Sequence, residues 1–214
     1  MRKTLLLFVI ALVCAPVCFA QNFAPARDYS FYEFYVGYAY ERADNGADRL
    51  ESGATAVVNG VTLTHINLQP QNTAGNGFLV EFNQNVHRNV GIVTSLSGTY
   101  DTVNYFDSVT GHTFRAKLQR YDLLAGPRFN ARYSNAVPFA HALFGVSHVR
   151  ASFDEVFNTQ HKTDTAFAMA LGGGIDLNAG EHIDIRAGQF DYIPTFFNGK
   201  RQDNFRFSAG VKIK

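Results

Sequence analysis

The stretch from Thr165 to Leu177, TAFAMALGGGIDL, alternates between two kinds of residue. From Phe167 onward every second residue is apolar except for one glycine, and the residues between them are small or charged. Such alternation indicates a β-strand whose two faces meet different surroundings. A helix is the competing interpretation of AFAMAL, but Gly172–Gly174 follows closely, and each glycine in a helix costs about 1 kcal/mol relative to alanine. The alternation therefore predicts a sheet with one apolar face and one face of small side chains.

The same alternation recurs along the chain. Near the beginning, FYEFYVGYAYER places apolar residues on one face and leaves Tyr35 as an exception on the other. The most regular example is NFRFSAGVKIK at the end of the sequence. We identify eight such segments, at residues 31–42, 75–86, 89–102, 113–132, 137–153, 163–178, 182–195 and 202–213.

The connections between these segments differ in length. The first, third and fifth connections, around residues 43–74, 103–112 and 154–162, are longer than the second, fourth and sixth. In an up-and-down antiparallel sheet, odd and even connections lie at opposite ends. One end is therefore short and the other elaborated, which is typical of outer-membrane barrels with short periplasmic turns and longer external loops.

The second face of the strands decides between a soluble sheet and a barrel. A soluble antiparallel sheet would bury its bulky face and carry long charged side chains on the other, whereas here the second face is mostly Gly, Ala and Ser with isolated charges of both signs. This suits the narrow lumen of an eight-stranded barrel. We therefore expect an all-β fold, an eight-stranded antiparallel up-and-down transmembrane β-barrel with its apolar face toward lipid. Enclosed charges must pair or keep water, and the candidates for this interior polar network are Glu33, Glu41, Glu81, Asp122, Arg128, Asp184, Arg186, Arg206 and Lys212.

Some positions need separate interpretation. Proline belongs at edges, bulges or strand ends, so we expect Pro127 at a bulge near the periplasmic end. His141 and His148 lie in opposite phases of one segment, and the pattern leaves open which of them points inward. Aromatic residues near strand ends are expected at the membrane interfaces; these are Tyr100, Tyr121, Phe129, Tyr192 and Phe205.

The first twenty residues have the pattern of a secretory signal. Arg2 and Lys3 precede a short apolar core, and Cys18-Phe19-Ala20 is a small-x-small cleavage site. A membrane-spanning helix would need roughly 20 apolar residues. We predict a signal peptide at 1–20, a short N-terminal segment at 21–30 and the barrel at 31–214. Both cysteines lie in the predicted signal, and without it 17 basic and 18 acidic residues remain, which points to no nucleic-acid partner.

Seven segments taken in order are EFYVGYAYER (33–42), VGIVTSLSGTY (90–100), YDLLAGPRF (121–129), VPFAHALFGV (137–146), FAMALGGGID (167–176), RAGQFDY (186–192) and NFRFSAGV (204–211). Together they resemble the small outer-membrane β-barrel family related to the transmembrane domain of outer-membrane protein A, in particular its stand-alone, acidobacterial-like versions. The resemblance implies an outer-membrane location, contact with lipid and lipopolysaccharide, insertion by the barrel-assembly machinery, a monomer, and no catalytic residue, cofactor or metal. Members often end in an aromatic residue, whereas this chain ends in Ile213-Lys214, and we expect no peptidoglycan-binding module.

Motifs for chemistry are weak in this sequence. Gly172–Gly174 continues into a strand, whereas a dinucleotide loop requires a helix there, and no histidine pair has the spacing of a strong metal site. A lipid A deacylase would need a Ser-His-acid arrangement on the outer wall. Its nearest candidate, Ser147-His148, fails because adjacent strand residues point to opposite faces. Glu33 and Glu81 are better explained as ion-pair partners than as an acid/base couple.

Three functions remain open. The first is a non-enzymatic outer-membrane barrel that supports envelope integrity or presents external loops to a partner, chiefly around residues 43–74. The second is a narrow gated pore for small solutes, of small conductance because eight strands leave little open lumen. The third is a lipid A-modifying enzyme.

Overall fold

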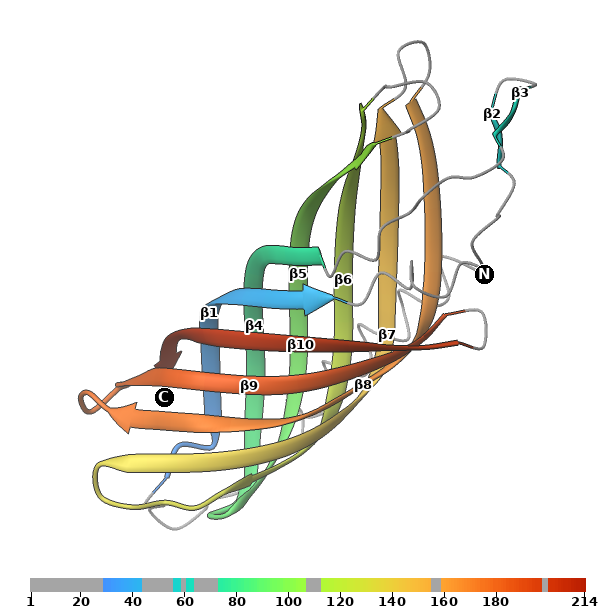
Figure 1. Ribbon diagram of the computed structural model, residues 1–214. Helices are drawn as coiled ribbons and strands as arrows, with labels where there is room; N and C mark the ends of the chain where they lie inside the picture. The colour runs from blue at the N-terminus through green and yellow to red at the C-terminus, as the bar shows by residue number, and fades with distance from the viewer. Residues whose placement is uncertain are drawn as a thin grey trace.

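The computed structural model describes residues 29–43, 56–58, 61–63, 73–106, 113–154, 159–197 and 200–214, so the predicted signal and most of the segment at 21–30 lie outside the described residues. Eight strands close into a barrel in the order β1-β10-β9-β8-β7-β6-β5-β4, and every neighbouring pair is antiparallel (Figure 1). The predicted eight-stranded up-and-down barrel is therefore confirmed. The barrel strands are β1 (Tyr32–Ala43), β4 (Thr73–His87), β5 (Val90–Phe106), β6 (Thr113–Asn130), β7 (Ala136–Asp154), β8 (Thr159–Asn178), β9 (Ile183–Phe197) and β10 (Lys200–Ile213).

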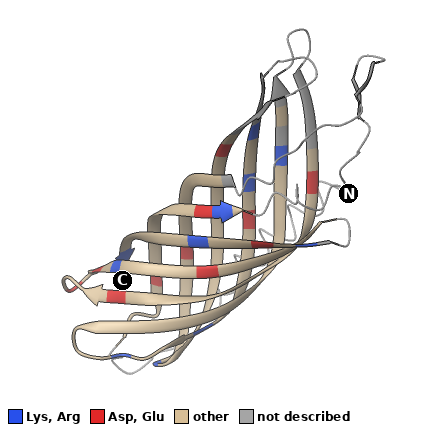
Figure 2. Cartoon of the chain, viewed as in Figure 1, with Lys and Arg blue, Asp and Glu red and all other residues tan. Residues whose placement is uncertain are grey.

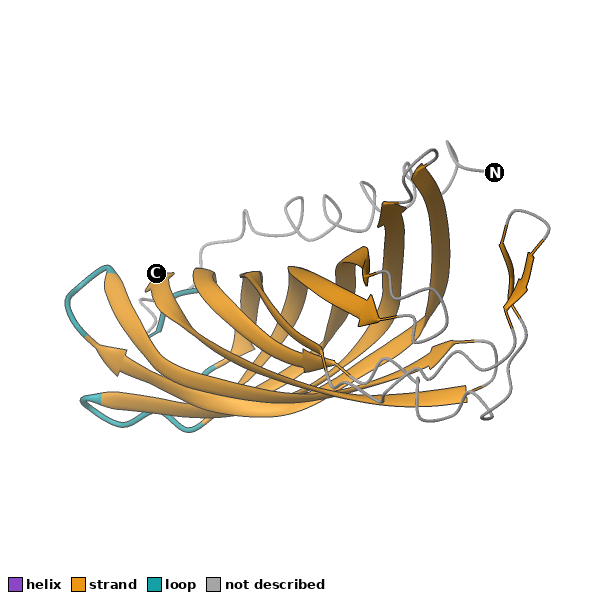
Figure 3. Ribbon diagram, turned by 45° about the horizontal axis from the view of Figure 1, so that its top comes forward, coloured by secondary structure: helices purple, strands orange, loops and turns teal. Residues whose placement is uncertain are grey.

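A separate pair of short antiparallel strands, β2 (Ala56–Val58) and β3 (Val61–Leu63), falls between β1 and β4 in sequence. Figure 3 shows strands throughout the described part of the barrel, with its short turns gathered at one end. The described residues include no helix long and apolar enough to cross a membrane.

The two ends of the barrel differ. The short-turn end carries the turns at residues 88–89, 131–135 and 179–182, and the long end carries the other connections. Strands β5 to β8 have 17, 18, 19 and 20 residues, against 12 to 15 in the other four. The sequence predicted long connections after residues 102 and 153, but these strands continue to Phe106 and Asp154. The extra length at this end is therefore partly strand.

Strands β5 to β8 rise beyond the closed part of the barrel (Figure 1). The β4–β5 ladder ends at Asn76 and Tyr100, and the β8–β9 ladder ends at Phe167 and Phe196. The β7–β8 ladder, in contrast, continues to the pair of Asp154 and Thr159. Beyond these points the four strands form an open sheet, which we call the β5–β8 extension.

The faces of the strands are arranged as the alternation predicts. Phe34, Phe167, Phe190 and Phe207 lie on the outside and expose between 42% and 55% of their surface. The residues between them point inward: Ala168 and Ala170, for example, are fully buried. Most bulky apolar side chains therefore cover the outer surface, and a small apolar cluster that includes Val93, Leu124, Leu143 and Ile193 lies inside the described barrel.

One prediction about an irregular position is corrected by the structure. The predicted bulge at Pro127 is wrong: the β6–β7 ladder lapses at Gly126 and Pro127 but resumes in the same register, because a proline has no N–H to donate. A bulge lies instead in β9 at Ala187-Gly188, where the register shifts against both β8 and β10. This extra residue reverses which phase of β9 points inward.

Candidate functional site

The most distinctive feature of the molecule is the set of charged side chains inside the barrel. The structure places all nine charged residues predicted for the interior on the inner face, each no more than 3% exposed. They come from β1, β4, β6, β9 and β10, and Figure 2 shows charged residues spaced along these strands among long uncharged stretches. Their contacts divide them into two clusters.

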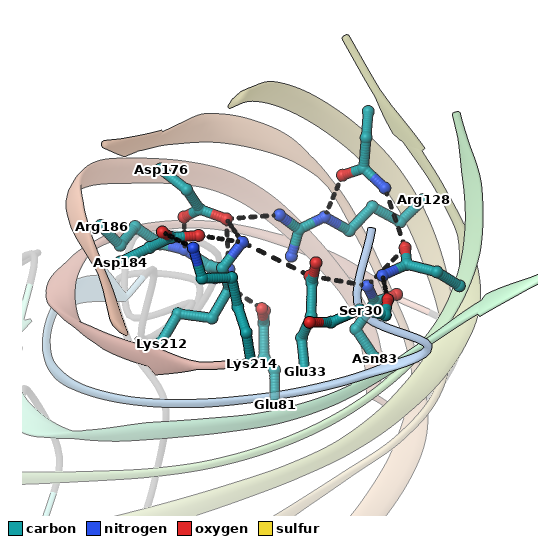
Figure 4. Close-up of polar contacts among 12 residues, drawn as sticks. Ser30, Glu33, Glu81, Asn83, Arg128, Asp176, Asp184, Arg186, Lys212 and Lys214 are labelled. Carbon is teal, nitrogen blue, oxygen red and sulfur yellow. Dashed lines mark hydrogen bonds and ion pairs between the residues drawn. The ribbon is translucent and has the colours of Figure 1, made fainter. Parts of the chain in front are cut away.

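The lower cluster lies toward the short-turn end and contains Glu33, Glu81, Arg128, Asp176, Asp184, Arg186 and Lys212 (Figure 4). Asp176 is its centre: its carboxylate lies 2.7 Å from both Arg128 Nη2 and Arg186 Nε, and 3.0 Å from Lys212 Nζ. Lys212 Nζ also lies 2.9 Å from Asp184 Oδ2. One carboxylate on β8 therefore collects cations from β6, β9 and β10.

Aromatic rings complete this cluster. The guanidinium carbon of Arg186 lies 3.9 Å from the ring centre of Tyr35 and 4.5 Å from that of Phe139. Arg128 approaches the same Phe139 ring at 3.7 Å. Desolvated cation–π contacts of this kind contribute about 2 kcal/mol or more. Tyr35, the exception to the alternation of β1, is thus explained: it points inward and contacts Arg186.

The upper cluster lies toward the long end and contains Glu41, Arg120, Asp122, His141, Asp191 and Arg206. Arg206 Nη2 lies 2.8 Å from Asp191 Oδ2, and Arg206 Nη1 lies 4.0 Å from Asp122 Oδ2 on the opposite wall. Arg120 pairs with both Glu41 and Asp122.

Hydrogen bonds to neutral side chains tie this cluster together. The Ser97 hydroxyl accepts from Arg206 Nη1 at 2.6 Å and donates to Asp122 at 3.2 Å. Thr99 donates to Glu41 at 3.0 Å. The carboxylates of the upper cluster are therefore held by hydroxyl groups as well as by cations.

Gln189 joins the two clusters. Its side-chain nitrogen donates to Glu81 Oε1 at 3.0 Å and to Asp191 Oδ2 at 2.9 Å. Across the two clusters and the residues that pair with them, seven carboxylates face seven basic groups. The carboxylates are those of Glu33, Glu41, Glu81, Asp122, Asp176, Asp184 and Asp191, and the basic groups are those of Arg120, Arg128, Arg132, Arg186, Arg206, Lys212 and Lys214. The charges of this lumen network therefore balance, as burial in a medium of low dielectric constant requires.

The network closes the lumen. Arg186 on β9 reaches Glu81 on β4, and Arg206 on β10 reaches Ser97 on β5, so single side chains cross the interior. Arg128, Arg186 and Arg206 are at most 1% exposed, which leaves no water-sized space beside them. This arrangement holds the walls together and blocks the interior.

The histidines of β7 are now assigned. His141 points inward, with Nε2 2.9 Å from Asp191 Oδ1, whereas His148 is exposed on the outer face with Nδ1 2.7 Å from the Thr165 hydroxyl. Ser147 is fully buried, so it and His148 lie on opposite faces. Among the described residues no group of His, Cys, Asp and Glu has the geometry of a metal site.

Sequence reasoning missed six members of the network, which are Asp176, Asp191, Gln189, Arg120, Arg132 and Lys214. Asp176 lies in phase with the inward residues of β8 and could have been included. Asp191 and Gln189 fall in the opposite phase to Arg186, and only the bulge at Ala187-Gly188 brings all three inside. The available signal was the five-residue interval between the outward residues Ile185 and Phe190, which is odd and so breaks the alternation.

No family model matches the chain, and no curated protein matches it by sequence. Among solved structures it is similar to Ail, the attachment invasion locus protein of Yersinia pestis, in complex with the heparin analogue sucrose octasulfate, with a TM-score of 0.50 and 18% identity over 85% of this chain and 97% of that chain. It is also similar to Neisserial surface protein A, with a TM-score of 0.55 and 14% identity over 86% of this chain and 97% of that chain. The chain therefore shares the fold of these small barrels.

Proposed function

We propose that this protein is a non-enzymatic outer-membrane β-barrel whose closed interior makes it a rigid support for a surface at its long end. A signal at residues 1–20 directs the chain to the periplasm, where the barrel-assembly machinery inserts it as a monomer. The short-turn end then faces the periplasm, and the long end faces outward. The observation that carries the proposal is the placement of apolar side chains outside and of paired charges inside.

The outer surface supports the membrane location. Outward apolar residues continue along each strand, as from Phe205 to Ile213 on β10 and from Phe167 to Leu177 on β8. Transmembrane strands need about 9–11 residues, which matches these intervals. Monomeric soluble proteins rarely expose contiguous apolar patches larger than a few hundred Å², so a lipid environment accounts best for such a surface.

The closed interior favours a support over the gated pore. Conduction would require the side chains that cross the lumen to leave it, and each broken buried ion pair costs about 3–5 kcal/mol when one partner stays unpaired. The enzyme alternative has less support, because Ser147 and His148 point to opposite faces. The names of the two similar structures, an attachment invasion locus protein and a surface protein, agree with a role at the cell surface.

Fractionation and conductance test this proposal. The protein should be recovered with outer membranes and should migrate differently on gels before and after heating, as a closed barrel does. Purified protein in planar bilayers should show no steady conductance. Recovery in the soluble fraction would contradict the membrane location, and well-resolved channel steps would favour the pore. A changed lipid A mass spectrum in a deletion strain would favour the enzyme.

A further inference from the structure

Charged side chains on the outer face of the described strands are few and unevenly placed. Among the strand residues whose side chains the structure describes, alternation and burial put Arg42, Lys117, Arg150 and Arg201 outside together with the acidic Asp203, and all five lie toward the long end. Asp203 pairs with Arg201 at 3.0 Å. Asp101 and Asp164, at comparable places on β5 and β8, follow the inward phase of their strands. The outer rim at the long end is therefore basic.

The basic residues on β6 and β7 continue directly from the apolar surface. Leu123 pairs with Val146 across the two strands. The next outward pair is Tyr121 with His148, and the pair after that is Gln119 with Arg150. Along these two strands the outer surface thus changes in two steps. The aliphatic pair is followed by the phenol of Tyr121 and the imidazole of His148, and then by the guanidinium group of Arg150.

A pocket adjoins these residues. It opens where β4 and β5 separate above Asn76 and Tyr100, has a volume of about 360 Å³, and is lined also by Lys117 and Gln119. Tyr100 is held at its lower edge by Tyr121, with the two hydroxyl oxygens 3.1 Å apart. Amide, phenol and ammonium groups therefore surround a hollow at the upper edge of the apolar belt, together with the carboxylate of Asp101.

We propose that this outer basic patch, formed by Lys117, Gln119, Tyr121, His148 and Arg150, binds a phosphate group on the headgroup of an outer-leaflet glycolipid of the lipid A type. The inference rests on the membrane orientation proposed above. A lipid is the occupant because the patch is continuous with the apolar belt: acyl chains lie against Leu123 and Val146 while the phosphate reaches Arg150. Basic residues near a membrane surface attract anionic lipids, by a factor of about five in affinity each.

Native mass spectrometry of the refolded protein in a zwitterionic detergent tests the proposal. Wild type should bind diphosphoryl lipid A more tightly than dephosphorylated lipid A. Arg150→Gln and Lys117→Gln should each weaken binding of the diphosphoryl form about fivefold, and the double variant by about 25-fold. Arg201→Gln is the matched control, because it removes an exposed outer arginine that Asp203 already neutralises, and its affinity should equal that of wild type.

Three outcomes would overturn the assignment. The first is equal binding of the phosphorylated and dephosphorylated lipids, and the second is an unchanged affinity of the double variant for diphosphoryl lipid A. The third is displacement of lipid A by a soluble sulfated oligosaccharide, which would make the patch a site for soluble polyanions. The heat-dependent gel shift is measured on every sample. A wild-type protein that lacks the shift, or is recovered as a soluble protein, contradicts the proposed membrane function, whereas a normal shift without phosphate-dependent binding contradicts the lipid site alone.

Discussion

Arg186 Nη1 lies 2.6 Å from Glu81 Oε2, although β9 and β4 are separated in the wall by β10 and β1. The same guanidinium donates to Asp176 on β8 from its Nε at 2.7 Å. One side chain on β9 thus connects the neighbouring strand β8 with β4, which is distant in sequence, and this makes Arg186 the principal link across the lower lumen.

Removal of the Glu81 charge should destabilise the barrel. Glu81→Gln leaves Arg186 with one carboxylate partner in a buried site, which we expect to cost about 3 kcal/mol in the free energy of unfolding. Urea unfolding in lipid vesicles measures this difference. The control is Glu181→Gln in an exposed turn, which should change stability by less than about 0.5 kcal/mol. Equal stabilities for the two variants would contradict the structural role of the pair.

Gly37 is required by the close approach of Tyr35. A Cβ atom at Gly37 would lie within van der Waals overlap of the Tyr35 hydroxyl and of the Ala209 carbonyl oxygen, so a methyl group there must displace the ring that contacts Arg186. We expect Gly37→Ala to cost about 1–3 kcal/mol. Gly180→Ala is the matched control, because a Cβ there meets no atom within 4 Å. The same unfolding measurement compares them, and a neutral Gly37→Ala would show that the Tyr35 contact is dispensable.

The lumen should open when its crossing side chains are shortened. The double variant Arg186→Ser with Arg206→Ser removes the two guanidinium groups that reach Glu81 and Ser97. We expect it to give measurable ion conductance in planar bilayers while wild type and Glu181→Gln do not, since water then replaces the removed groups. If the heat-dependent gel shift is kept but no current flows, other side chains suffice to close the interior.

A charged side chain on the outer face of the barrel should destabilise the protein in a membrane. Phe207 is 49% exposed on the apolar belt of β10, and Phe207→Arg should cost about 2–4 kcal/mol if this position lies near the bilayer midplane. The yield of the heat-modifiable form after refolding into phosphatidylcholine vesicles should fall. Phe207→Leu keeps the position apolar and should refold like wild type. A soluble barrel would give the opposite result, because an exposed arginine in water is harmless.

Much of the fold could be predicted from the local alternation of residues in the sequence. Alternation with a period of two is a property of each strand by itself, so the positions of eight strands, the outward face of Phe167 and Phe207, and the inward face of Glu81 and Arg206 could be predicted without knowledge of which strands are neighbours. The ends of β5 to β8 were less predictable. Residues 103–106 and 159–162 lie outside the segments that the alternation predicted, and cross-strand pairing with 113–116 and 151–154 keeps them in strands.

The contacts inside the barrel, in contrast, are determined only by the tertiary structure. The choice of His141 over His148, the entry of Asp191 and Gln189 into the lumen, and the partner of every buried charge depend on the register and on the bulge at Ala187-Gly188. Alternation tells which face a side chain takes. Closure of the barrel brings opposite walls within reach of one arginine, so the ion pairs exist only when all eight strands are in place.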